Sequence, residues 1–235
     1  MSALDGRVAF VTGSSRGIGA SVARKLSEAG AKLGLASRSG DDLGLPDALG
    51  LVCDVTRPAE VDAAVVRTVE EHGRLDILVN NAGVGAYGPY LELPPEQLEA
   101  MVDVNLKGTL YATRAALPHL LESDAADIVA VASVAGLRGF PEEAVYCASK
   151  FGQVGFMRAL DHELRERGVR CTNVCPGGVA TDFAMGHGRT EDMPELKGMM
   201  TGDDVADAVL FVITRPRDVR MLTVSFRPMS EPSSG

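Results

Sequence analysis

Thr12-Gly13-Ser14-Ser15-Arg16-Gly17-Ile18-Gly19 is the stretch of sequence that decides the fold. It follows an apolar run from Arg7 to Thr12, which is typical of a buried β-strand, and it opens a segment of helical period from Gly17 to Ala29. Glycines allow a tight turn and the close approach of a ligand, while a helix N-terminus offers unpaired amides and a favourable dipole to an anion. The stretch therefore predicts a strand, a turn that binds a diphosphate, and a helix.

The remaining sequence repeats this alternation of short apolar runs with longer segments of helical period, which is typical of crossover units in a parallel sheet. The predicted strands are Arg7 to Thr12, Lys32 to Ser37, Leu49 to Cys53, Leu75 to Asn80, Asp127 to Ala132, Val169 to Cys175 and Val219 to Phe226. The predicted helices are Gly17 to Ala29, Pro58 to Glu71, Pro95 to Glu122, Ala144 to Arg167 and Asp203 to Thr214. Pro58 and Pro95 suit first helical turns, whereas Pro118 predicts a kink or an early end.

These elements predict an α/β fold, in which one Rossmann-type domain spans residues 1–235 as a doubly wound sheet of seven parallel strands with helices on both faces. The connection from Arg38 to Leu49 is too short for a full helix, so we expect a loop or a single turn. The irregular segment from Phe183 to Gly202, which includes Pro194, is read either as a mobile substrate lid or as an ordinary surface excursion. Ser230 to Gly235 is expected to be a frayed end.

Composition excludes several classes of protein. A chain of 235 residues that is 46% hydrophobic can bury a core without metal ions or disulfides, so we expect no metal. The net charge of −9 and the lack of a basic run argue against a nucleic-acid partner, and the apolar run near the N-terminus is too short to span a membrane. A cytoplasmic location is expected. The cysteines form no CxxC pair and are predicted to be buried free thiols: Cys53, Cys147, Cys171 and Cys175.

Further motifs follow the glycine-rich turn in a fixed order. The turn itself has the spacing G-x3-G-x-G, and it is followed by Asp54, Asn80-Asn81-Ala82-Gly83, Asn105, Ser133, Tyr146-x3-Lys150, and Pro176-Gly177 with Thr181. With these motifs the chain resembles the short-chain dehydrogenase/reductase family, in its single-domain form, over nearly its whole length. The resemblance implies an oxidoreductase that uses a nicotinamide dinucleotide.

The predicted catalytic residues are Asn105, Ser133, Tyr146 and Lys150. Tyr146 and Lys150 are four residues apart and share one helix face, where a cation would lower the phenol pKa from its usual value of about 10. Tyr146 would then donate a proton to a carbonyl oxygen that Ser133 holds at the carboxyl edge of the sheet. The resemblance further implies that Lys150 binds the nicotinamide ribose and that Asn105 holds a water linking Lys150 to solvent. Taken singly, each residue also suits an ordinary helix or turn.

The predicted cofactor is NADP, with NADPH preferred and NAD possible. Ser37 stands where NAD enzymes have an acidic residue, and Arg38 and Arg16 are suited to pair with the extra phosphate. The alternative is that both arginines are merely solvated. The resemblance implies that Asp54 and Val55 contact the adenine, that Asn81, Ala82 and Gly83 line the ribose beside it, and that the segment after the sixth strand holds the nicotinamide amide. The cofactor set is Gly13, Ser15, Arg16, Gly17, Ile18, Gly19, Ser37, Arg38, Asp54, Val55, Asn81, Ala82, Gly83, Tyr146, Lys150, Pro176, Gly177, Val179 and Thr181.

Three functions remain open at this point. The favoured function is an NADPH-preferring oxidoreductase that interconverts a carbonyl and a secondary alcohol in a small ketone or 3-hydroxy compound. The second is a 3-oxoacyl-thioester reductase acting on an acyl carrier protein, for which Arg138 is the one candidate docking cation. The third is a non-catalytic NADP sensor or scaffold, against which the complete catalytic set argues.

The C-terminal run from Val219 to Pro228 lacks the glycine-rich, aspartate-containing end of fatty-acid reductases and looks more like family members that oxidise small 3-hydroxy acids. Pocket walls are expected from Ala135 to Glu142, Tyr87, and Phe183 to Met200. The partner is a small-molecule substrate. The resemblance also implies a homotetramer or homodimer that packs through Pro95 to Glu122 and the helix carrying Tyr146.

Overall fold

The computed structural model describes residues 2–190, 192–193 and 196–231. Its centre is a sheet of seven parallel strands in the order β3-β2-β1-β4-β5-β6-β7. The strands are β1 (Val8–Thr12), β2 (Lys32–Ser37), β3 (Ala48–Val52), β4 (Ile77–Asn80), β5 (Asp127–Val131), β6 (Arg170–Pro176) and β7 (Thr223–Phe226). The order reverses direction between β1 and β4, which marks the crevice where open α/β sheets bind ligands. The prediction of a doubly wound, Rossmann-type fold is confirmed.

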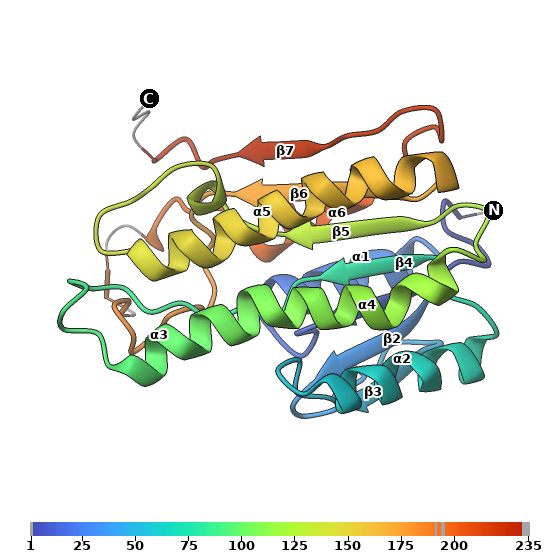
Figure 1. Ribbon diagram of the computed structural model, residues 1–235, viewed down its shortest axis with the longest axis horizontal. Coiled ribbons are helices and arrows are strands. Elements are labelled where there is room, and N and C mark those ends of the chain that lie inside the picture. The colour runs from blue at the N-terminus through green and yellow to red at the C-terminus, as the bar shows by residue number, and fades with distance from the viewer. Residues whose placement is uncertain (1, 191, 194–195, 232–235) are drawn as a thin grey trace.

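Helices cover both faces of the sheet. One face carries α2 (Pro58–His72), α4 (Gly108–Leu120) and α5 (Ala144–Leu164), and the other carries α1 (Gly17–Glu28) and α6 (Gly202–Ile213) (Figure 1). In the described residues no helix is long and apolar enough to cross a membrane. Side chains that alternate along a strand enter opposite layers, so Phe10 and Leu78 pack on the first face while Val11 and Val79 pack on the second.

The predicted helix from Pro95 to Glu122 is divided in the structure. It consists of α3 (Pro95–Met101), a π-helical turn η1 (Val102–Lys107) and α4, so an inserted π turn interrupts one continuous rod. Pro118 lies inside α4, and the helix ends two residues later at Leu120, which matches the early end that its missing N–H predicts. The interruption therefore lies near Asn105 and not at the proline.

Other boundaries differ by a few residues from the sequence-based expectation. β7 begins at Thr223 rather than Val219, and residues 38–47 form no helix, as the short connection predicts. Two short 3-10 turns, η2 (Val134–Gly136) and η3 (Arg165–Arg167), follow β5 and α5. The helix predicted from Ala144 to Arg167 is α5 followed by η3, so its last turn changes from α-helical to 3-10 geometry.

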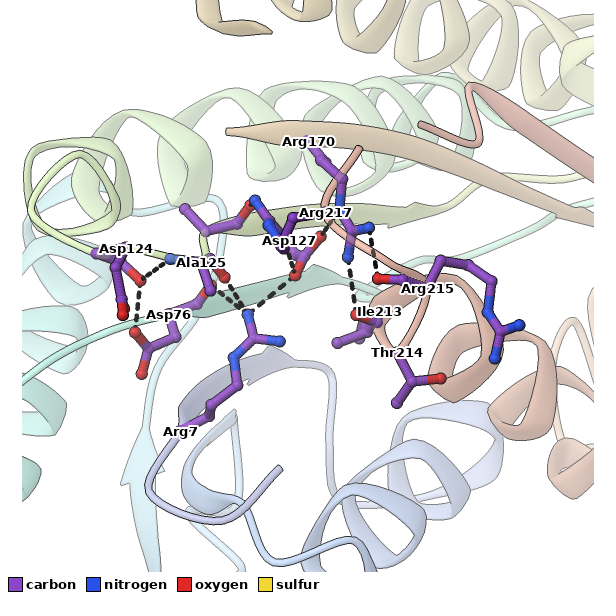
Figure 2. Close-up of polar contacts among 12 residues, drawn as sticks. Arg7, Asp76, Asp124, Ala125, Asp127, Arg170, Ile213, Thr214, Arg215 and Arg217 are labelled. Atoms are coloured by element: carbon purple, nitrogen blue, oxygen red, sulfur yellow. Dashed lines mark hydrogen bonds and ion pairs between the residues drawn. The ribbon is translucent and has the colours of Figure 1, made fainter. Parts of the chain in front are cut away.

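At the amino edge of the sheet, opposite the predicted site, buried Asp127 binds three arginines. Its carboxylate accepts hydrogen bonds from Arg170 at 2.7 Å, Arg7 at 2.9 Å and Arg217 at 3.0 Å (Figure 2). These arginines come from the segment before β1, from β6 and from the segment before β7, and they also donate to backbone carbonyls such as Ile213 O at 2.8 Å. The cluster ties together segments distant in sequence around one carboxylate.

All four cysteines are buried free thiols, as predicted. Cys53 follows β3, Cys147 lies on α5, and Cys171 and Cys175 lie on β6. Burial raises the thiol pKa of Cys53 and Cys175 to about 11.

Candidate active site

A cavity of about 820 Å³ lies at the carboxyl edge of the sheet, and the segments that follow β1, β4, β5 and β6 line it. Every residue of the predicted catalytic and cofactor sets lines this cavity except Asn105. The structure thus brings together groups that lie up to 168 positions apart, from Gly13 to Thr181. Asn105 is fully buried behind the cavity wall.

The glycine-rich turn is shaped for close contact with β4. Gly13 has a φ of +65°, and a Cβ placed on Gly19 would lie 2.2 Å from the carbonyl oxygen of Gly13. Asn81 Nδ2 donates to the carbonyls of Thr12 at 3.0 Å and Gly13 at 3.1 Å, which fastens the turn to the end of β4. The first turn of α1 has no side-chain cap, so its amides face the cavity mouth available to an anion.

Two exposed arginines flank the end of the cavity next to β2. Among the described residues, neither Arg16 nor Arg38 has a hydrogen bond or an ion pair. Ser37 beside them accepts a hydrogen bond from the Gly40 amide at 3.1 Å. Asp54, across this end, accepts from the Thr56 amide at 2.9 Å, which holds the pKa of its carboxyl below the usual range. The carboxylate is therefore charged at neutral pH; the charge of Arg38 acts on it, but neither guanidinium group forms an ion pair with a described residue.

Tyr146 and Lys150 lie on one face of α5, four residues apart. The Lys150 ammonium is 5.9 Å from the centroid of the Tyr146 ring, and it donates to Val131 O at 3.0 Å and to Gln153 Oε1 at 3.1 Å. Burial lowers the pKa of Lys150 to about 8. This lysine is therefore anchored between the end of β5 and its own helix.

The phenol of Tyr146 differs from the sequence-based expectation. Burial raises its pKa, and the main opposing influence is a hydrogen bond with the Ser133 side chain rather than the charge of Lys150. Ser133 also accepts from the Ala135 amide at 3.1 Å, which fixes its hydroxyl beside the phenol. At neutral pH Tyr146 is protonated and can donate.

Asn105 lies in the π-helical turn, which directs its amide to the segment after β4. Its Oδ1 accepts from the Val84 amide at 2.8 Å, and its Nδ2 donates to Val84 O at 2.9 Å and to Ser149 Oγ at 3.0 Å. A Cβ on Gly83 would lie 3.4 Å from Asn105 Oδ1 and 3.9 Å from Lys150 Nζ, so both polar groups adjoin that glycine. The asparagine thereby fixes the loop that separates it from the cavity.

The far end of the cavity combines aromatic and charged side chains. The rings of Tyr87 and Phe183 each pack against Tyr146 with centroids 5.7 Å apart. The charged residues that line this end are Arg138, Glu143, Asp182, Arg189, Arg227 and Glu231. Of these, Arg138 and the range containing Arg189 were expected from the sequence.

The segment expected to be a lid lies against the loop that carries Tyr87. His187 O accepts from the Tyr87 amide at 2.9 Å, and the Met200 carbonyl accepts from Ala180 N at 2.8 Å. Phe183, Arg189 and Met199 from this segment line the cavity, so it forms a wall of the site. Residues 191, 194 and 195, among them Pro194, lie outside the described part of the chain.

Glu231, near the C-terminus, is a cavity residue that sequence reasoning missed. Its Oε1 accepts from the Gly178 amide at 2.7 Å, its Oε2 lies 3.5 Å from Arg227 Nε, and the neighbouring Ser230 donates to Gly198 O at 2.9 Å. No sequence motif identifies this segment, because Glu231 contacts the cavity only after the chain has folded back beside the residues that follow β6. The remainder of the predicted frayed end, residues 232–235, lies outside the described residues.

A glycine-rich turn, a Tyr-Lys pair and a serine that share one cavity at the switch point of a parallel sheet define a dinucleotide-dependent oxidoreductase. A family model described as short chain dehydrogenase matches residues 7–192. The chain belongs to the short-chain dehydrogenase/reductase family and is an NAD(P)-dependent oxidoreductase.

Relatives agree in length as well as in sequence. An uncharacterized oxidoreductase of Staphylococcus aureus is 33% identical over 236 residues, covering 97% of this chain and 100% of the relative. A similarly described protein of Staphylococcus haemolyticus is 35% identical over 242 residues, again covering 97% and 100%.

Solved structures show the same fold. An alcohol dehydrogenase of Thermococcus sibiricus, complexed with 5-hydroxy-NADP, superposes with a TM-score of 0.87 at 28% identity and covers 97% of this chain and 99% of that one. A metagenomic short-chain oxidoreductase in complex with NADP has a TM-score of 0.80 at 33% identity, with coverages of 97% and 99%.

Proposed function

We propose that this protein is an NADPH-preferring oxidoreductase that interconverts a carbonyl and a secondary alcohol in small ketones or 3-hydroxy compounds. The observation that carries the proposal is that Ser133, Tyr146 and Lys150 line the same cavity as the glycine-rich turn. A bound nicotinamide would supply or accept the hydride. The protein's own part is to hold the substrate oxygen and to move one proton.

In the proposed reduction, Ser133 donates a hydrogen bond to the substrate carbonyl oxygen and Tyr146 Oη transfers its proton to that oxygen. The carbonyl carbon gains a hydride and the oxygen gains a proton, which yields the alcohol. Lys150 would bind the nicotinamide ribose and support the proton's replacement, while Asn105, buried behind the Val84 segment, would hold a water that links Lys150 to solvent. The raised pKa of Tyr146 keeps the phenol protonated at neutral pH, as the proton transfer in the reduction step requires.

The preference for NADPH is supported by Arg16 and Arg38, whose guanidinium groups form no ion pair in the described chain. A ribose 2′-phosphate would give them one. Asp54 and Val55 would contact the adenine, Asn81, Ala82 and Gly83 would line its ribose, and Pro176, Gly177, Val179 and Thr181 would hold the nicotinamide amide. If the Arg38→Gln variant kept the wild-type ratio of NADPH to NADH affinity, the preference would have to be assigned elsewhere.

An acyl-carrier substrate is less well supported. Arg138, the candidate docking cation, lies in the cavity wall with its guanidinium 4.5 Å from the centroid of the Phe140 ring. We further propose a cytoplasmic homotetramer or homodimer, for which light scattering at micromolar concentration is the direct measurement. A monomeric mass would contradict the oligomer.

The test of function is NADPH oxidation by the purified protein with aldehydes, ketones, 3-oxo esters and 3-oxoacyl thioesters, alongside Tyr146→Phe. This substitution removes only the hydroxyl, so turnover should fall at least 100-fold, on the scale of general acid catalysis, while NADPH affinity stays within about twofold. Near-normal turnover by the variant would refute the mechanism. Binding of NADPH without turnover of any substrate by the wild type would favour a sensor.

A further inference from the structure

The charged side chains at the substrate end of the cavity are not all engaged in the same way. Glu231 is held by the Gly178 amide at 2.7 Å and lies 3.5 Å from Arg227 Nε. The guanidinium groups of Arg138 and Arg227 lie over the Phe140 ring, at 4.5 Å and 5.8 Å from its centroid. Glu143 and Arg189, which also line the cavity, form no ion pair within the described chain.

Arg189 faces the reacting end of the cavity. Its guanidinium lies 5.7 Å from the centroid of the Tyr87 ring, and that ring packs edge-on against Tyr146. Its one hydrogen bond to a described residue runs from Nη1 to Val179 O at 3.3 Å, which leaves most of its five N–H donors for a ligand. Its positive charge lowers the pKa of both Tyr87 and Tyr146, so its electrostatic field reaches the phenol that we propose as the proton donor.

Three carboxylates line this end of the cavity with Arg189, namely Glu143, Asp182 and Glu231, and Glu143 is the one whose carboxyl pKa Arg189 lowers. It lies just before α5, and the ionisable groups that act on its carboxyl are Arg189 and Glu231. Burial raises its pKa to about 6, Arg189 opposes that rise and Glu231 adds to it, so the carboxyl is mostly charged at neutral pH and loses its charge just below it. Charges of both signs therefore act on Tyr146: the Glu143 carboxylate raises the pKa of the phenol and the Arg189 guanidinium lowers it.

We infer that the substrate carries a carboxylate in addition to the carbonyl or alcohol that reacts, and that Arg189 binds this carboxylate while the reacting oxygen lies at Ser133 and Tyr146. The inference rests on the proposed function and narrows it to short oxo or hydroxy acids. A planar guanidinium with several open donors suits a carboxylate by bidentate hydrogen bonding, whereas a neutral substrate gains nothing from it.

The test compares 3-hydroxybutanoate and 3-hydroxypentanoate with their methyl esters, each oxidised with NADP⁺, because an ester removes the charge and keeps the reacting alcohol. The wild type should prefer the acid in kcat/KM by about 10- to 100-fold, the range of a hydrogen bond to a charged group. Arg189→Gln should abolish this preference by raising the KM of the acid. Arg189→Lys keeps the positive charge and should retain part of the preference.

Two further variants separate charge from structure. Glu143→Gln removes the opposing carboxylate, so it should lower the KM of the acid and strengthen the preference, opposite in sign to Arg189→Gln. Arg215→Gln makes the same chemical change outside the cavity, where the guanidinium lies over Phe211, and should leave the preference unaltered. If Arg189 had a purely structural role, Arg189→Gln would lower kcat/KM for the acid and for the ester by the same factor.

The outcomes distinguish this inference from the function on which it rests. The carboxylate assignment is overturned if the wild type has the same kcat/KM for acid and ester, or if Arg189→Gln lowers both values equally. Either result leaves the oxidoreductase proposal standing. A wild type that turns over neither these compounds nor the wider panel of carbonyls overturns the proposed function, and the inference falls with it.

Discussion

At the residue scale, the environment of each side chain decides its chemistry more than its identity does. The Tyr146 and Lys150 spacing correctly predicts a shared helix face, yet the sequence does not reveal that Lys150 is aimed at Val131 O. The same burial that raises the pKa of Tyr146 lowers that of Lys150. Spacing fixes which residues are neighbours, whereas desolvation depends on packing that no short motif encodes.

The pKa of Lys150 leads to a pH prediction. A base whose pKa is lowered to about 8 carries its charge below that pH and loses it above. Because Tyr146 stays protonated throughout this range, kcat for reduction should fall as the pH rises through about 8. Steady-state rates at saturating NADPH from pH 6 to 10 check this. Lys150→Arg should flatten the alkaline limb, even at a lower rate, and an undiminished wild-type kcat at pH 9.5 would contradict the assignment.

At the element scale, the site depends on two departures from regular structure. The π-helical turn between α3 and α4 directs Asn105 at the Val84 segment, and the chain after β7 returns so that Glu231 binds the Gly178 amide. Hydrophobic periodicity predicts one unbroken helix through the first and gives no signal for the second. Both depend on partners distant in sequence, which explains why the helices and strands could be predicted while these details could not.

The Glu231 contact should affect cofactor binding, because Gly178 adjoins the residues proposed to hold the nicotinamide. Glu231→Ala removes the acceptor of the Gly178 amide, and we expect NADPH affinity to fall by about tenfold, the value of one charge-assisted hydrogen bond. Glu231→Gln keeps a side-chain oxygen that can accept from the same N–H, so NADPH affinity should fall less in this variant. NADPH fluorescence titration measures both, and wild-type affinity in the alanine variant would show that the contact is dispensable.

At the scale of the whole molecule, the carboxyl and amino edges of the sheet have different roles. The carboxyl edge holds the cavity, while the amino edge is tied together by Asp127 and its three arginines (Figure 2). The alternation of strand and helix patterns was sufficient to predict the seven parallel strands and the edge that bears the site. It could not predict the Asp127 cluster, since four residues in four separate segments carry no local pattern.

Asp127→Asn should destabilise the protein without altering the active site. It leaves Arg7, Arg170 and Arg217 close together without their shared anion, and breaking such a buried pair costs about 3–5 kcal/mol of the free energy of unfolding. Urea unfolding measures the loss, and kcat per folded molecule should be unchanged. Asp124→Asn is the matched control, because its pair with Arg74 is solvent-exposed and should matter far less. If the free energy of unfolding fell by a similar amount in both variants, burial would not be what makes the Asp127 ion pairs stabilising.

The rates at which the four buried cysteines react with a thiol reagent report how often the structure around each of them opens. A thiol with a raised pKa and no access to water resists alkylating reagents until the backbone around it moves. The labelling rates of Cys53, Cys171 and Cys175, read by mass spectrometry, would thus record how soon the end of β3 opens relative to β6. Cys53 also lines the cavity, so a slower reaction of this thiol when NADPH is added would report occupancy of the cavity with no engineered probe.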